Sequence, residues 1–246
     1  MDNQFDPRVT GVNAASVGVP RAARDVGLRS YMLSVYNYMA SGVLLTAIVA
    51  LLFAPYAGQV LISHTGRGPS GLGWIVTLSP LAFVFALSMG VQRMQISTVR
   101  MLFFAFSAVM GLSMSTLFLA FTGVLIAQTF AAVTASFLGL SLFGYTTKKD
   151  LSAFGTFLIM GVVGILIAMV INMFLHSAAM QLAISAIGVL LFAGLTAYDT
   201  QRIKSTYAYI AGSDMVGKSA VMGALTLYLD FINMFQFLLS FMGNRR

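Results

Sequence analysis

The chain has 246 residues, of which 59% are hydrophobic and only 9% are charged, against roughly 25% charged residues in an ordinary soluble domain. So few charges cannot cover a soluble fold, and the long unbroken apolar runs exclude a β-barrel. The absence of cysteine excludes a disulfide scaffold, a thiolate metal site and a cysteine nucleophile. We attribute the formal net charge of +7 to orientation in a membrane and not to nucleic-acid binding. The composition therefore predicts an all-α polytopic membrane protein.

Seven apolar segments are long enough to cross a bilayer, for which a helix needs about 20 mostly apolar residues. Turn-forming or charged residues separate these segments at Pro55 with residues 66–73, at Thr122-Gly123, at residues 148–150 and at His176-Ser177. The predicted spans, in chain order, are 32–54, 71–92, 100–121, 124–145, 151–175, 178–199 and 220–242.

The ends of the chain differ from its apolar body. Residues 1–30 are polar, carry four arginines and are expected to form a mobile basic tail on the cytoplasmic side, ahead of a single transmembrane domain over 31–246. With seven spans and a cytoplasmic N-terminus, 11 basic residues lie inside and 3 outside, as the positive-inside rule favours. Two of those outside are Arg245 and Arg246. The alternative is six spans plus a re-entrant C-terminal segment, which brings both ends inside.

Two of the seven acidic residues, all of them aspartate, are not explained by membrane insertion. Asp199 closes the uncharged run 151–198, and Asp230 lies near the middle of the last span. An ionised carboxylate at the bilayer centre costs about 2.5–3.5 kcal/mol, so Asp230 is expected to face the bundle interior, to be paired or to stay protonated. The plainer interpretation of Asp199 is a carboxylate at the membrane edge, with Arg202 three residues away.

The residues around Asp230 support an inward face. Five small or polar residues are spaced three, four, three and seven positions apart, so they lie along one face of a helix with 3.6 residues per turn. This stripe consists of Gly223, Thr226, Asp230, Asn233 and Ser240. The opposite side carries Leu229, Ile232 and Phe235. Asn233 is one turn from Asp230 and can donate a hydrogen bond to it. For the other polar members of the stripe, helix packing is the plainer interpretation.

With these aspartates in view, the chain resembles the Bax inhibitor-1 (transmembrane Bax inhibitor motif) family, and most of all its bacterial inner-membrane branch. The resemblance runs from about Tyr31 to the C-terminus and implies a seven-helix bundle with the last helix at its centre. Three stretches carry it: LGLSLFGYTTKKDLS at 138–152, AGLTAYDTQRI at 193–203 and GALTLYLDFINMF at 223–235.

The resemblance also implies a function. Members of this family are described as pH-sensitive calcium leak pathways marked by two intramembrane aspartates, which correspond by motif to Asp199 in AYDTQ and Asp230 in LYLDF. A basic residue at the cytoplasmic end of the second helix holds the closed form in family members. Arg93 is the nearest candidate for that residue here, and Arg100 is the second. The second span carries no acidic residue, so a further acidic gate residue there is missing.

The expected mechanism rests on the two carboxyl groups. Two carboxylates forced close together cannot both ionise cheaply, so we expect Asp199 and Asp230 to share a proton or a cation. Their protonation would bias the packing of the second span against the sixth and seventh, with Arg93 as the counter-charge. Oxygen ligands suit calcium, and the two carboxylates with Asn233 and Thr226 make a weak site of the kind that a leak requires. We expect no resident cofactor, and calcium only as the transported ion.

Other functions remain open at this point. An intramembrane aspartyl protease also uses two aspartates, one in a Tyr-Asp pair such as Tyr198-Asp199, but the glycines that such enzymes carry before the second aspartate are absent before Asp230. We therefore expect no catalytic residues, and we group Tyr198 with the supporting residues. A non-transporting partner that modulates a membrane protease or membrane protein quality control is the main alternative, with residues 1–30 as its docking element. A proton-coupled transporter is the least favoured. The expected partners are the lipid bilayer, calcium ions and another membrane protein, with no nucleic acid.

Overall fold

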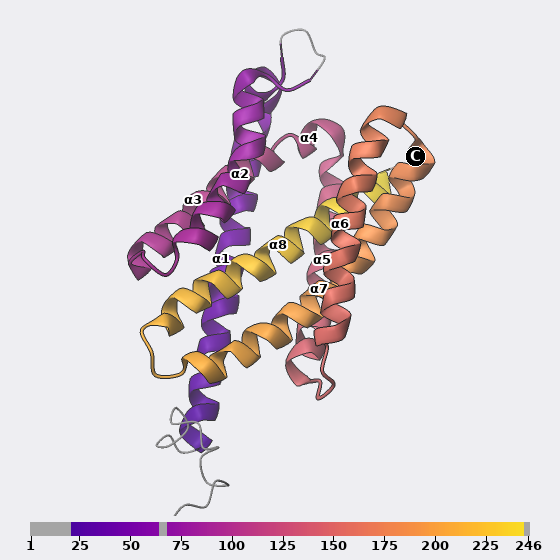
Figure 1. Ribbon diagram of the computed structural model, residues 1–246. Coiled ribbons are helices and arrows are strands. Elements are labelled where there is room, and N and C mark those ends of the chain that lie inside the picture. Colours follow the sequence, from indigo (N-terminus) through magenta and orange to yellow (C-terminus); the bar gives the residue numbers. More distant parts are fainter. Residues whose placement is uncertain (1–20, 64–67, 244–246) are drawn as a thin grey trace, which may run out of the picture.

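The computed structural model describes residues 21–63 and 68–243. These residues form helices joined by short turns, with one isolated β-bridge between Ile62 and Pro69 (Figure 1). The helices are α1 (Arg21–Leu61), α2 (Gly71–Gly90), α3 (Ile96–Met114), α4 (Leu117–Ala120), α5 (Gly123–Thr146), α6 (Ser152–Leu175), α7 (Ala178–Ile210) and α8 (Met215–Gly243). When α3 and α4 are taken as one span, seven helices in the described part are long and apolar enough to cross a membrane, which confirms the predicted number.

The first helix is longer at both ends than the sequence predicts. Residues 21–30, assigned to the mobile tail, are already helical, and residues 1–20 lie outside the described residues. Pro55, expected to end the first span, lies inside α1, which continues to Leu61. A proline removes one backbone N–H, but a transmembrane helix can absorb that loss within its surroundings. Hydropathy predicts where a helix crosses the membrane and not where the helix itself ends.

The last two helices form a hairpin with a short turn. The predicted sixth span ends at Asp199, but α7 continues to Ile210, and only residues 211–214 separate it from α8. Gly212 in this turn has a φ of +82°, a conformation that glycine adopts without strain. Helix α8 runs unbroken over 29 residues, about 43 Å at 1.5 Å per residue, which exceeds the thickness of the hydrocarbon core. The re-entrant alternative is therefore wrong.

Helix α8 is the centre of the bundle, as the family resemblance implied. It packs against α7, α1, α5 and α3, and Figure 1 shows it crossing the middle of the molecule. In the most apolar 18-residue stretch of α8, 50% of the residues are buried, whereas the corresponding share is at most 33% in the other six spans. Helix α2 packs mainly on α3 and α1. The expected packing of the second span against the sixth and seventh is therefore not the main contact that α2 makes.

Glycines allow two pairs of helices to approach closely. A Cβ atom on Gly111 of α3 would lie 2.7 Å from the carbonyl oxygen of Thr46 on α1. On the other side of the bundle, a Cβ atom on Gly144 of α5 would overlap the carbonyl of Ala197 on α7. Small residues have this role in membrane bundles because they let backbones come together. The contact between Gly144 and Ala197 lies two residues from Asp199 and fixes the position of that part of α7 against α5.

Candidate functional site

The α7–α8 hairpin brings the two unexplained aspartates together. Asp199 and Asp230 lie 31 residues apart in the sequence, yet their carboxyl groups are within hydrogen-bonding distance of each other. Both side chains are buried, with exposed fractions of 8% for Asp199 and 4% for Asp230. The pair therefore lies inside the bundle, in segments that cross the membrane. The sequence could not establish this contact, because it depends on how α7 and α8 pack.

One oxygen of this pair has no hydrogen-bond partner. Within the described part of the chain, Oδ2 of Asp230 is the buried side-chain oxygen or nitrogen that makes no hydrogen bond. Burying a polar atom without a partner is unfavourable, and burying a charged one is much more so. A proton or a cation held between the two carboxyl groups would remove this penalty. The geometry thus suits a site that holds a small positive charge.

The basic residues near the pair differ from those expected. Arg202, one turn beyond Asp199 on α7, supplies the positive charge that acts on the Asp199 carboxyl group. The exposed Arg93 lies in the turn that follows α2, where its backbone N–H donates to Gly90. Arg100, also exposed, places its guanidinium 5.6 Å from the centre of the Tyr38 ring. The role of Arg93 as counter-charge stays a prediction.

The expected supporting residues on α8 bond to their own helix. Asn233 donates its side-chain N–H to the carbonyl of Leu229 at 2.8 Å, so the expected hydrogen bond from Asn233 to Asp230 is not formed. Thr226 likewise donates to a carbonyl one turn back in the helix, at 3.2 Å. The carbonyl four residues earlier is always within reach of such a side chain, which explains both bonds. On α7, Tyr198 packs against Gly155 of α6.

The polar stripe does not mark the only buried face of α8. Ile232 and Phe235, on the side opposite Asp230, have exposed fractions of only 4% each. Phe235 is one edge of an aromatic cluster with Phe130 of α5. Because α8 is surrounded by other helices, both of its faces are buried, and the stripe separates polar from apolar contacts. The stripe correctly predicted that Asp230 lies in the interior, but it did not predict that the opposite side of α8 is buried as well.

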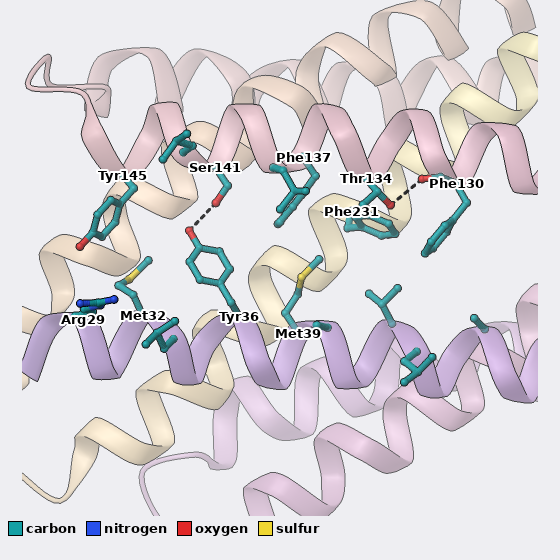
Figure 2. Close-up of a pocket in the computed structure, with 17 residues that line it drawn as sticks. Arg29, Met32, Tyr36, Met39, Phe130, Thr134, Phe137, Ser141, Tyr145 and Phe231 are labelled. Atoms are coloured by element: carbon teal, nitrogen blue, oxygen red, sulfur yellow. Dashed lines mark hydrogen bonds between the residues drawn. The ribbon is translucent and has the colours of Figure 1, made fainter.

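A chain of hydroxyl groups, buried at Thr200 and partly buried at Tyr36, links three helices beside Asp199. Thr200 on α7 donates to the carbonyl of Thr196 at 2.7 Å, so its single proton is used there. Ser141 on α5, 3.0 Å from Thr200, must then be the donor to Thr200, and Tyr36 on α1 the donor to Ser141 at 2.6 Å. Figure 2 shows the Tyr36–Ser141 bond crossing between α1 and α5.

A second buried contact lies next to Asp230. Thr46 on α1 donates to the carbonyl of Ser107 on α3 at 2.8 Å, so the Tyr228 hydroxyl on α8 must be the donor to Thr46, at 2.6 Å. Sequence reasoning missed both hydroxyl contacts. Thr200 and Tyr228 do lie in the stretches that carry the family resemblance, beside the aspartates. Their partners on α1 lie outside those stretches and could not be found without the fold.

The site offers few ligands to a metal ion. In the described part of the chain, no three or more His, Cys, Asp or Glu side chains gather into a group that could hold a metal. A cation at the pair would therefore have two carboxylates as its charged ligands. Calcium bound tightly has six to eight oxygen ligands, so this donor set fits weak binding at most.

Comparison with known proteins supplies the family. The family model described as "Inhibitor of apoptosis-promoting Bax1" matches residues 28–246. The chain belongs to the Bax inhibitor-1 family. It is 45% identical over 223 residues to protein RP147 of Rickettsia prowazekii, covering 90% of this chain and 92% of that protein. It is 43% identical over 233 residues to the inner membrane protein YbhL of Escherichia coli K12, covering 94% and 97% of the two chains. A protein of Caulobacter vibrioides is 40% identical over 248 residues, with coverage of 95% and 96%.

These relatives also agree with the predicted location. YbhL is named as an inner membrane protein, and this member of the Bax inhibitor-1 family has seven helices able to span a membrane in its described part. The chain is therefore a multi-pass protein of the bacterial inner membrane. The cytoplasmic position of its N-terminus stays a prediction from the distribution of basic residues.

Proposed function

We propose that this protein is a pH-sensitive leak pathway for calcium, or a similar hard cation, across the inner membrane, and that it is not an enzyme. One observation carries the proposal: Asp199 and Asp230 meet inside the bundle, within hydrogen-bonding distance, on helices that cross the membrane. Ionisable groups at such depth are costly, and they commonly mark ion or proton pathways. The unpartnered oxygen of Asp230 gives a proton or cation a place to bind.

The proposed gate is the charge state of this pair. Two ionised carboxylates at short range repel each other strongly where the surroundings are apolar, and a shared proton or a bound cation relieves that repulsion. The change would alter the spacing of α7 and α8. It would then reach α1, α3 and α5 through the hydroxyl contacts at Thr200 and Tyr228, which lie one and two residues from the aspartates. In this proposal, the arrangement in which both carboxyl groups are buried is the closed pathway.

Weak binding is consistent with a leak. An ion that passes through a membrane must enter its site and leave again, so a tight cage would stop transport. Two carboxylates attract calcium, while Thr226 and Asn233 use donor groups in bonds within α8 and could offer only uncharged oxygen atoms to the ion. We therefore propose that calcium is the transported ion and not a resident cofactor.

Calcium flux into proteoliposomes, followed with a trapped calcium-sensitive dye as the pH is varied, tests this proposal. Asn has no charge to lose or gain, so Asp199→Asn and Asp230→Asn should each change the flux and remove most of its pH dependence. If both variants keep the wild-type flux and pH profile, the proposal fails. The wild-type protein could instead show no flux but cleave a transmembrane substrate, with either Asp→Ala change abolishing the cleavage. That result would favour an aspartyl protease over a leak.

Asp150→Asn is the matched control for these variants. Asp150 is exposed in the loop before α6, and hydrogen bonds from the Ser152 side chain and backbone N–H lower the pKa of its carboxyl group. A lowered pKa means that these bonds are present at neutral pH and are lost only as the pH falls below about 4. Asp150 therefore keeps its charge over the range in which the pair is proposed to titrate, and Asp150→Asn should keep the pH profile of the wild-type flux.

The counter-charge can be assigned with two further variants. Arg202 acts on Asp199 in the structure, whereas the family resemblance points to Arg93. Removal of the positive charge that favours the ionised pair makes ionisation harder, so the midpoint of the flux profile should move to higher pH. We expect this shift for Arg202→Gln. A shift in Arg93→Gln with none in Arg202→Gln would assign the counter-charge to Arg93.

A further inference from the structure

An apolar groove that is separate from the aspartate pair runs between α1 and α5. It has a volume of about 840 Å³, and its walls extend from Arg29 to Ala47 on α1 and from Phe130 to Tyr145 on α5. At 1.5 Å per residue the α1 wall is about 27 Å long, close to the thickness of the hydrocarbon core. Figure 2 shows the two helices lying side by side, with the labelled side chains facing the space between them. The groove therefore has the length and polarity of an extended hydrocarbon chain.

The charged end of this groove differs from the rest. Arg29 lines one end together with Tyr145 (Figure 2). Lys204 of α7 lies at the same end, where its ammonium group donates to the Tyr145 carbonyl at 2.7 Å and lies 4.8 Å from the centre of the Tyr145 ring. Toward the other end the walls are apolar apart from the Tyr36–Ser141 bond and Thr134. One end thus suits an anion, and the remainder suits an acyl chain.

The groove opens toward the membrane. Leu44 of α1 and Leu138 and Leu142 of α5 belong to its lining, and their exposed fractions are 61%, 64% and 63%. These side chains lie in spans that cross the bilayer, so their surroundings are lipid. Contacts with lipid chains are therefore available along the whole groove, and the positive-inside count assigns the Arg29 end to the cytoplasmic leaflet.

We propose that the α1–α5 groove binds one anionic phospholipid of the cytoplasmic leaflet, with an acyl chain along the groove and the phosphate beside Arg29. The charge complementarity between the cationic end and an anionic headgroup selects this occupant over a second copy of the chain. Attraction of about 1 kcal/mol per basic residue at a membrane surface corresponds to about a fivefold preference for an anionic over a zwitterionic lipid. This inference does not rest on the proposed leak, because it concerns binding alone.

The single tryptophan of the chain makes a direct test possible. In a Trp74→Phe background, Leu142→Trp places the sole fluorophore in the groove, and phospholipids with brominated acyl chains quench a tryptophan that they touch. Vesicles hold equal amounts of phosphatidylglycerol and phosphatidylcholine, and the bromine is carried by one or the other. Arg29 is the basic residue of the groove lining, whereas the ammonium group of Lys204 is held by the Tyr145 carbonyl and ring. We therefore expect phosphatidylglycerol to bind next to this tryptophan about fivefold better, and Arg29→Gln to reduce the ratio to about one.

Two controls make the result specific to the groove. Phe157 on α6 is 65% exposed, lies about as far from the end of its helix as Leu142 does, and does not line the groove. A tryptophan introduced by Phe157→Trp should therefore show no lipid preference, with or without Arg29. Ala40→Phe fills the groove and leaves Arg29 in place, so it should abolish the preference at Leu142→Trp. The proposal is overturned if Leu142→Trp shows no preference, if the preference survives Arg29→Gln or Ala40→Phe, or if neither lipid quenches this tryptophan. No calcium is present, so the outcome is independent of the leak.

Discussion

Tyr228 holds the helix of Asp230 against two neighbours. It is the largest of the fully buried side chains in the described residues, and its ring meets Phe106 edge-on with centroids 5.1 Å apart. Its hydroxyl donates to Thr46, which in turn donates to the carbonyl of Ser107. This contact ties α8 to α1 and α3 two residues before Asp230. A hydroxyl buried in this way has no water to replace a lost partner.

Tyr228→Phe should therefore lower the free energy of unfolding measurably without changing the fold. The ring and its aromatic contacts remain, and only the hydroxyl and its bond to Thr46 are lost. Hydrogen bonds in membrane bundles contribute about 0.6 kcal/mol on average and up to about 1.7 kcal/mol, and we expect a loss within this range. Reversible unfolding in bicelles measures it. Tyr209→Phe is the control, because Tyr209 is 87% exposed, and an equal loss in both variants would contradict the argument.

Among the elements, α5 and α7 form the closest approach near the aspartate pair. Gly144 lies against the backbone carbonyl of Ala197, and the Ser141–Thr200 hydroxyl contact lies one turn away on the same two helices. A backbone atom cannot move aside as a flexible side chain can. The position of α7 beside α5, and with it that of Asp199, therefore depends on the missing side chain at Gly144.

Gly144→Ala should separate α5 from α7 and destabilise the bundle. An added methyl group in a tight contact typically costs about 1–3 kcal/mol, since the neighbouring backbone must shift. Gly139→Ala on the same helix has open space around the new methyl group and removes a flexible residue, so it should be neutral or stabilising by up to about 1 kcal/mol. Thermal unfolding of the two variants in detergent compares them. Equal stability of Gly144→Ala and Gly139→Ala would mean that this approach does not position α7.

At the scale of the whole molecule, the sequence predicts what depends on the membrane and misses what depends on packing. Apolar runs bounded by turn residues such as Thr122 and His176 correctly separated the spans, because lipid imposes a minimum length of apolar helix. The ends of α1 and α7 were missed because a helix that leaves the membrane can continue with polar residues. Asp199 and Asp230 stood out because insertion opposes them, whereas the Tyr36 and Thr46 hydroxyl contacts and the α1–α5 groove arise only from tertiary packing.

The distribution of basic residues predicts the orientation of the bundle in the membrane. This orientation can be measured by cysteine labelling, because the chain has no native cysteine that would also react. Ala178 and Ala211 are exposed residues at opposite ends of α7. With the N-terminus in the cytoplasm and seven spans, Ala178→Cys faces the periplasm and Ala211→Cys faces the cytoplasm. A membrane-impermeant maleimide should label Ala178→Cys in intact cells and label Ala211→Cys only after the inner membrane is opened. The reverse pattern would invert the topology, and it would also place the Arg29 end of the groove in the outer leaflet, where the positive-inside rule does not favour it.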